Sequence, residues 1–250
     1  YLPKEQDIET SETGDTIFDF PRGPKAGSCI HGIYEDLVFD DPSGMPEIIA
    51  RQLERYGFES RWSPVVRSMV KCSLQKELDP ESGLSLEQVP SSRMLKEMEF
   101  YFPIDAFRVE RVYRAVREEE PPHGDRDITG GFMKGYIDLV FRYGEQFFIL
   151  DYKTNHLGNR AEDYSQEALK VEMKEAHYDL QYHIYTAALH RYLGRRLSDY
   201  SYSHHFGGVY YLFLRGVQEG PGDTGIFFDR PGEDRIARLE KVFSREAIDG

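Results

Sequence analysis

A short hairpin with charged ends limits what this 250-residue chain can fold into more than any other feature. Two apolar runs, residues 136–142 and 146–152, flank a Tyr-Gly-Glu-Gln sequence whose central Gly-X pair is typical of a two-residue type II′ turn. Counting outward from that turn places Asp138 opposite Asp151, with their Cβ atoms roughly 4.5–5.5 Å apart. Lys153 follows two residues later, and the two-residue period of a strand returns it to the face of Asp151.

Charges in this arrangement predict a metal-dependent phosphodiesterase site. Facing carboxylates repel each other unless a cation lies between them or a proton is shared. Magnesium binds a few carboxylates together with water and phosphate oxygens, which Asp138 and Asp151 could provide. Lys153 would orient or deprotonate the attacking water, or stabilise the charge that develops on the phosphate. Residues 147–150 are continuously apolar and therefore predict a central strand, where a charged triplet is unusual.

Composition narrows the class of protein. The chain has 31 Lys and Arg against 44 Asp and Glu, a net charge of −13, which argues against a simple DNA-binding module but not against a nuclease. No apolar run approaches the ~18 residues of a membrane span, and the first residues do not have the pattern expected of a secretory signal. Two cysteines are too few for an iron–sulfur cluster, which needs about four. We expect a cytoplasmic location, no membrane partner and, because the chain begins at Tyr1, a segment of a longer polypeptide.

Periodicity predicts a mixture of helices with a short sheet, which is an α/β fold. Residues 1–16 are polar and acidic, and we expect them to be a tether from a preceding domain. Residues 105–130 have the composition of a variable insertion. The expected elements are a helix beginning near Ser28, two helices within 47–76, a half-buried strand at 95–103, helices at 164–176, 178–196 and 233–243, and a buried strand at 209–214.

An Asp followed one strand later by Asp-X-Lys resembles the signature of the PD-(D/E)xK nuclease superfamily, and further blocks resemble its RecB-type nuclease domains. The blocks occur in one order, at residues 20–23, 30–37, 98–104, 134–142, 150–155, 178–182, 188–193 and 204–217. Ile137 replaces the proline of the superfamily name, which is ordinary within this branch. The resemblance covers about residues 17–240. It implies a restriction-endonuclease-like core with a mixed central sheet flanked by helices, a domain over 17–250 and a catalytic core at about 94–216.

The same resemblance implies further site residues. RecB-type nucleases use a histidine in a Gly-X-X-X-His block as a metal ligand, which is His31 here. Glu99 matches an acidic residue of the family, with Glu97 as a near competitor, because alternation places both on one face. Gln181 and Tyr182 match a pair that would face the site and hold DNA. Tyr182 also lies in an aromatic stripe that would pack its helix against the sheet.

The implied activity is that of a magnesium-dependent DNA nuclease domain in a RecBCD-type helicase–nuclease, acting on unwound DNA during double-strand-break repair and recombination. The expected catalytic residues are Asp151, Lys153 and Glu99, and the expected metal ligands are His31, Asp138 and Asp151. Manganese should substitute for magnesium, whereas calcium should bind without supporting cleavage. Implied partners are single-stranded DNA, an ATP-driven helicase motor, RecC, RecD and RecA. The alternative function is a platform that docks RecA for loading onto single-stranded DNA.

Overall fold

The computed structural model describes residues 15–79, 81–104, 107–117, 127–128 and 131–243. Almost all of the expected tether at 1–16, and part of the expected insertion at 105–130, therefore lie outside the described residues. The described strands are β1 (Met94–Ile104), β2 (Phe107–Arg108), β3 (Asp127–Ile128), β4 (Gly131–Tyr143), β5 (Gln146–Lys153), β6 (Phe206–Phe213) and β7 (Ile226–Asp229). The described α-helices are α1 (Pro24–Asp36), α2 (Met45–Arg55), α3 (Ser63–Gln75), α4 (Val109–Arg117), α5 (Gln166–Glu175), α6 (Tyr178–Arg196), α7 (Tyr202–His205) and α8 (Glu233–Phe243).

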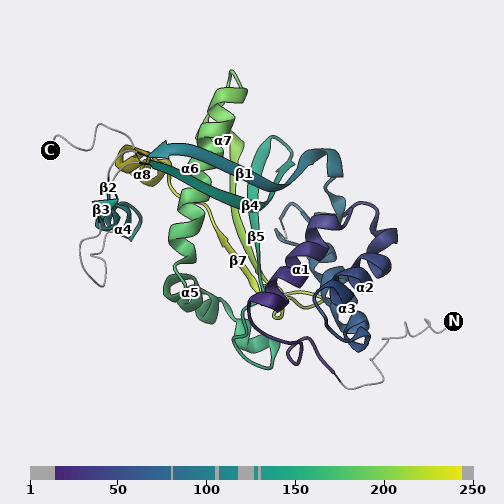
Figure 1. The fold of residues 1–250 in the computed structure, drawn as a ribbon. Helices are drawn as coiled ribbons and strands as arrows, with labels where there is room; N and C mark the ends of the chain where they lie inside the picture. The colour runs from purple at the N-terminus through teal and green to yellow at the C-terminus, as the bar shows by residue number, and fades with distance from the viewer. Residues whose placement is uncertain (1–14, 80, 105–106, 118–126, 129–130, 244–250) are drawn as a thin grey trace.

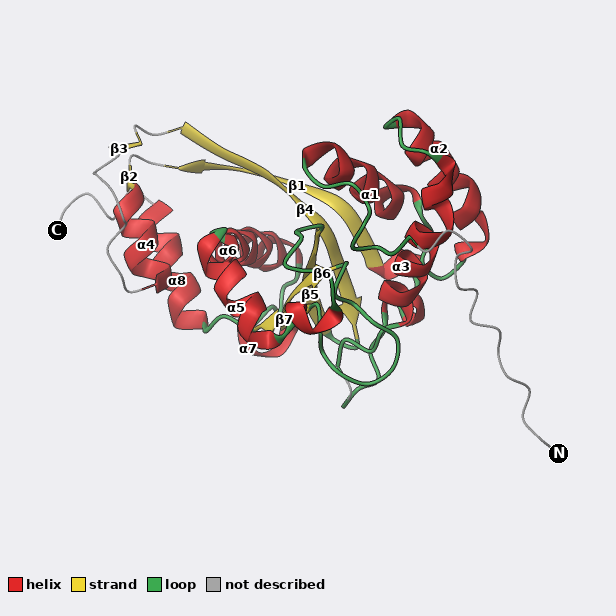
Figure 2. Cartoon of the chain, turned by 90° about the horizontal axis from the view of Figure 1, so that it is seen from below, coloured by secondary structure: helices red, strands yellow, loops and turns green. Residues whose placement is uncertain are grey.

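A five-stranded mixed sheet forms the centre of the fold, in the order β1-β4-β5-β6-β7. β5 pairs parallel with β6, and the other neighbours are antiparallel. Helices α1–α3 cover one face of the sheet, while α5, α6 and α8 lie on the other face (Figures 1 and 2). A mixed sheet between two helical layers confirms the expected α/β fold class.

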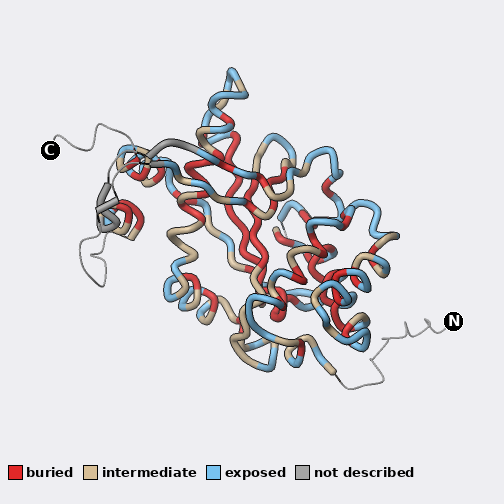
Figure 3. Tube along the Cα trace, viewed as in Figure 1, coloured by how far each residue is buried: buried red, intermediate tan, exposed pale blue. Residues whose placement is uncertain are grey.

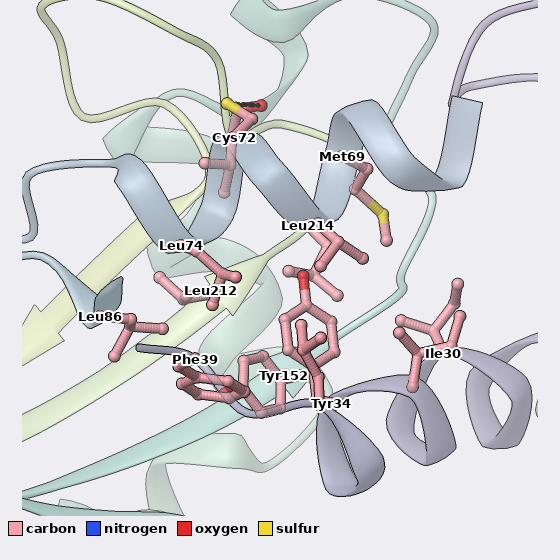
Figure 4. Packing of buried hydrophobic residues seen from close by; sticks show 14 of the residues in the cluster. Ile30, Tyr34, Phe39, Met69, Cys72, Leu74, Leu86, Tyr152, Leu212 and Leu214 are labelled. Atoms are coloured by element: carbon pink, nitrogen blue, oxygen red, sulfur yellow. Dashed lines mark hydrogen bonds between the residues drawn. The ribbon is translucent and has the colours of Figure 1, made fainter. Parts of the chain in front are cut away.

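Two buried clusters hold these layers together. The first joins α1–α3 to one face of the sheet, where the rings of Tyr34 and Tyr152 stack with centroids 4.0 Å apart (Figure 4). The second joins α6 and α8 to the opposite face and includes Ile149, Leu189 and Tyr211. All eight residues of β6 are buried, and Figure 3 shows buried residues concentrated in the central strands. The central strands of the sheet are thus shielded on both faces, as the continuously apolar run at residues 147–150 predicts.

The hairpin has the register that its turn predicts. Tyr143 pairs with Gln146. Of the two turn residues, Gly144 has a positive φ of 59 and Glu145 does not have a positive φ, which is the pattern of a type II′ turn. Ladder pairing between β4 and β5 ends at Leu139 and Leu150, one position before the two aspartates. Beyond that point β5 continues beside β6 alone. The two strands therefore separate at the position where the carboxylates emerge.

In both β1 and β4, the alternation of side chains between the two faces of the sheet is interrupted near the same point. Leu139 packs into the first cluster, but Ile137, two residues earlier on the same strand, packs into the second. Strict alternation would put both on one face, so the backbone is irregular between them. On β1 the irregular residue is Glu97, which has a φ of 48, and the β1–β4 register places it opposite Asp138. The irregularity turns both acidic side chains toward the layer that contains α1.

Element boundaries agree with the sequence for α6 and α8 and differ elsewhere. α1 begins at Pro24 rather than near Ser28, because Gly23 with φ 95 ends the preceding loop and proline suits the first helical position. The helix expected at 164–176 is divided into a 3-10 helix, Ala161–Tyr164, and α5. None of the described helices has the length and apolar character needed to cross a membrane.

Candidate active site

Asp151 and Lys153 lie at the end of β5 on the face covered by α6. Asp151 is 2% exposed, and its Oδ1 is 2.5 Å from Nζ of Lys153, although no hydrogen bond of regular geometry reaches that oxygen. Burial, followed by the charge of Asp138, raises the pKa of Asp151 to about 7 against the opposing effect of Lys153. One lysine thus compensates the buried carboxylate only in part, and the site favours a further cation.

The side chain of Asp138 accepts a backbone hydrogen bond at the point where pairing between β4 and β5 has ended. Its Oδ2 accepts from the backbone N–H of Tyr152 at 2.9 Å, where β4 and β5 no longer pair. The same oxygen is 3.3 Å from Nδ1 of His31 on α1. Burial lowers the pKa of His31, but the hydrogen bond and charge of Asp138 and the charge of Asp151 outweigh it, so the net shift is upward. Three elements, α1, β4 and β5, therefore bring the three expected metal ligands to one region.

The structure places Glu97, rather than the expected Glu99, beside this cluster. Burial, together with the charges of Asp138 and Glu35, raises the pKa of Glu97. Glu99 is instead half exposed and pairs with Lys134, its Oε1 lying 2.6 Å from Nζ. The correction has a physical cause, because the positive φ of Glu97 ends the regular alternation that made the two glutamates equivalent.

Lys153 is held by α6 and β6 as well as by Asp151. Its Nζ donates to Oε1 of Gln181 at 3.2 Å, and the same oxygen accepts from the hydroxyl of Tyr211 at 2.9 Å. Nε2 of Gln181 donates to the hydroxyl of Tyr185 at 2.8 Å, and the ring of Tyr178 lies 4.1 Å from Nζ. Gln181 is therefore at the site, as expected. Tyr185 was not predicted, although its spacing of four residues from Gln181 on a helix could have indicated it.

Tyr182 points away from the site. It is 5% exposed, and its hydroxyl donates to Oδ2 of Asp229 on β7 at 2.8 Å. Consecutive residues of an α-helix are rotated by roughly 100°, so the neighbour of Gln181 faces the sheet interior. The structure therefore does not place Tyr182 at the site beside Gln181. Its place in the aromatic stripe that packs α6 explains its position.

The donor set suits a hard divalent cation. Within the described part of the chain, no three His, Cys, Asp or Glu side chains are already gathered closely enough to form a ligand cage. Asp138 and Asp151 nevertheless supply carboxylate oxygens, and His31 supplies a ring nitrogen. The ammonium group of Lys153 lies beside the buried Oδ1 of Asp151, and burial together with neighbouring carboxylates raises the pKa of Asp151 and of Glu97. These are the features that cation binding would relieve.

Comparison with known proteins is consistent with this geometry. The RecBCD enzyme subunit RecB of Escherichia coli is 41% identical over 235 residues, which are 92% of this chain and 20% of that protein. The RecBCD enzyme subunit RecB of Haemophilus influenzae is 36% identical over 237 residues, 93% of this chain and 19% of that protein. The protein of the same name from Mycolicibacterium smegmatis is 30% identical over 284 residues, 98% of this chain and 26% of that protein.

The chain thus spans about a fifth to a quarter of the length of these relatives. The family model described as PD-(D/E)XK nuclease superfamily matches residues 16–248. That match includes all the described elements and the cluster around Asp138, Asp151 and Lys153. The chain belongs to the PD-(D/E)XK nuclease superfamily.

Proposed function

We propose that this chain is the magnesium-dependent DNA nuclease domain of a RecBCD-type helicase–nuclease, hydrolysing phosphodiester bonds of unwound single strands during double-strand-break repair and recombination. The observation that carries the proposal is the convergence of Asp138, Asp151 and Lys153 where β4 and β5 separate, next to His31. The names of the relatives support RecC and RecD as partner subunits, together with the remaining part of a RecB chain.

Each residue would have a distinct role in hydrolysis. A bound divalent cation supplies activation of water and neutralisation of phosphate charge. Asp138, Asp151 and His31 would hold the ion. Lys153 would donate to the charge that develops on the phosphate, and Gln181 would keep its ammonium group in position.

Glu97 is the acidic residue that we assign to the site in place of Glu99. Its raised pKa makes it a candidate to accept a proton from the attacking water, or to bind through water to the ion. The assignment predicts that Glu97→Gln lowers kcat far more than Glu99→Gln does.

The nature of the ion follows from the donor set. Magnesium keeps tight octahedral geometry and retains several waters, so a site with few protein ligands leaves room for water and phosphate. Manganese accepts a nitrogen ligand more readily and should replace it. Calcium binds with longer and looser contacts and should allow DNA binding with little cleavage.

The test is cleavage of a labelled single-stranded oligonucleotide with magnesium, manganese, calcium or chelator. Asp151→Asn and Asp138→Asn should each abolish cleavage, and the double variant should be little worse than either, because groups that act as a unit are not additive. Asp234→Asn is the matched control, since this exposed carboxylate lies on α8 and pairs with Arg238. Undiminished cleavage by folded Asp151→Asn, or activity in chelator, would refute the proposal.

Nothing in the described part of the chain favours the alternative, a platform for RecA, over nuclease activity. The proposed DNA substrate also favours the cytoplasm as the location. The two buried free cysteines, Cys29 and Cys72, are compatible with that reducing compartment.

A further inference from the structure

The strands that carry Glu97 and Asp138 continue past the active site and expose aromatic side chains. Figure 1 shows β1 and β4 running on beyond α1 toward α8. Tyr101 and Phe132 are each 61% exposed, and Tyr136 is 45% exposed. Large apolar side chains that are this exposed and lie together commonly mark a binding surface. We call Tyr101, Phe132, Tyr136 and the intervening Lys134 the aromatic strip.

The aromatic strip lies on the side of the sheet to which Asp138 and Glu97 turn, the side of α1. Positions 132, 134 and 136 share a face by the two-residue period of β4, and the contact of Asp138 with His31 of α1 places that side chain on the same side. The intervening Ile137 is fully buried in the cluster on the opposite face. Tyr101 pairs with Lys134 in the β1–β4 register, so it joins the same surface.

The exposed surface begins where α1 no longer covers the sheet, next to the active site (Figure 1). His31 of α1 contacts Asp138, which marks the limit of helix cover on this face. Beyond that limit, Tyr136 is the first exposed residue on β4. Four residues of a strand span roughly 13 Å, so the surface from Tyr136 to Phe132 could accommodate a few nucleotides.

The arrangement of the side chains suits bases and phosphates. The rings of Tyr101 and Phe132 are stacked nearly parallel, with centroids 4.6 Å apart and planes at 11°. Nζ of Lys134 lies 5.3 Å from the ring centroid of Tyr136 and 2.6 Å from the carboxylate of Glu99. Proteins that bind single strands without sequence preference combine aromatic stacking surfaces with cationic side chains in this way.

We propose that the aromatic strip binds the single-stranded DNA that adjoins the scissile phosphate, with bases on the rings and a phosphate near Lys134. The proposal rests on the proposed nuclease function. A strand held at Asp138 must continue past the site, and the strip is an exposed surface on the same β-strand, two residues from Asp138. Glu99 acts against binding, because it occupies Lys134 and repels phosphate.

The experiment measures binding of a fluorescent oligothymidylate to the chain by anisotropy, in calcium to prevent cleavage. Tyr136→Ala and Phe132→Ala should each raise Kd roughly fivefold to a hundredfold, the range for loss of one stacked base. Lys134→Gln should raise Kd and reduce the slope of log Kd against log salt by about 0.7. Glu99→Gln should lower Kd, an effect that general damage to the fold would not produce.

Tyr192→Ala is the matched control, since this exposed ring lies on α6, away from the strip. Circular dichroism should show that every variant is folded. Unchanged Kd in the strip variants would overturn the proposal, and loss of RecC or RecD association with unchanged DNA binding would identify a protein interface instead. Wild type that binds DNA but cleaves nothing in magnesium or manganese would refute the nuclease function, while weaker binding by the variants would still support the strip.

Discussion

At the scale of single residues, the site concentrates charge that the folded chain alone does not neutralise. Burial and Asp138 raise the pKa of Asp151 to about 7, well above the ordinary value of 3.8. Between those values the folded state holds a proton that the unfolded state has lost. Stability therefore falls as pH rises through this window, by at most ~1.4 kcal/mol per pH unit. The raised pKa of His31 acts in the same direction at higher pH.

We therefore predict that Asp151→Asn is more stable than wild type at pH 8 in the presence of chelator. The difference should shrink as pH is lowered and disappear only well below the ordinary pKa of 3.8, because the wild-type carboxyl group is then protonated in both states. Urea unfolding at several pH values measures this dependence. A variant less stable than wild type at pH 8, or a difference that does not change with pH, would contradict the argument.

The position of Lys153 depends on a chain of contacts from α5. Oε1 of Glu172 accepts from Asn155 at 2.6 Å, and Oδ1 of Asn155 accepts from the hydroxyl of Tyr178 at 3.2 Å. The ring of Tyr178 then faces the ammonium group of Lys153. A desolvated cation–π contact contributes about 2 kcal/mol, so its loss should be visible in turnover.

Substitutions at Tyr178 separate the ring from its hydroxyl. Tyr178→Leu should lower kcat by roughly tenfold or more, because it removes the ring face that positions Lys153. Tyr178→Phe keeps the ring and loses only the hydrogen bond to Asn155, so its kcat should stay within about threefold of wild type. Single-turnover cleavage of one oligonucleotide measures both. Equal losses in the two variants would show that the ring has no special role.

At the scale of elements, one arginine joins the loop before α1 to the end of β5. Arg215 is 2% exposed and donates to the backbone carbonyls of Ile17, Phe20, Pro21 and Thr154 at 2.5–3.1 Å. Thr154 directly follows Lys153, and the loop leads into the helix that carries His31. Burial lowers the pKa of Arg215, which means that the folded state bears the cost of a desolvated charge.

Replacing Arg215 should therefore destabilise the fold through the carbonyls left behind. Arg215→Met should reduce the free energy of unfolding by about 3 kcal/mol or more, since several buried acceptors lose their donors. Arg215→Lys should be intermediate, because one ammonium group cannot reach all four carbonyls. Urea titration at constant pH gives both values. A change below about 0.5 kcal/mol for Arg215→Met would contradict this role.

The same elements show how far the sequence alone could lead. Turn chemistry fixed the register of the hairpin, so the approach of Asp138 to Asp151 was predictable from Gly144 and the apolar runs. The position of Glu97 was not predictable, because a single residue with positive φ leaves no periodic pattern in the sequence. Tyr182 was misplaced for a related reason, since a motif match gives neighbouring residues but not the direction of each side chain on a helix.

At the scale of the whole molecule, the site lies between two separately packed layers. His31 belongs to the α1–α3 layer, whereas Lys153 is held by α6 in the opposite layer. The aspartates between them lie on the sheet. An ion held by His31 and the two aspartates would thus join a helical layer to the sheet. Binding to the folded state alone raises stability by about 2.7 kcal/mol at a hundredfold excess over Kd.

We predict that manganese at such an excess raises the melting temperature of the chain by roughly 5–10 °C. His31→Ala should reduce this shift at the same concentration, whereas Asp234→Asn should retain it. Binding must displace protons from His31 and Asp151, whose pKa values are raised, so the shift should be larger at pH 8 than at pH 6. Thermal unfolding followed by circular dichroism, with chelator as reference, measures each case. An equal shift in His31→Ala, or a larger one at pH 6, would show that the ion binds elsewhere.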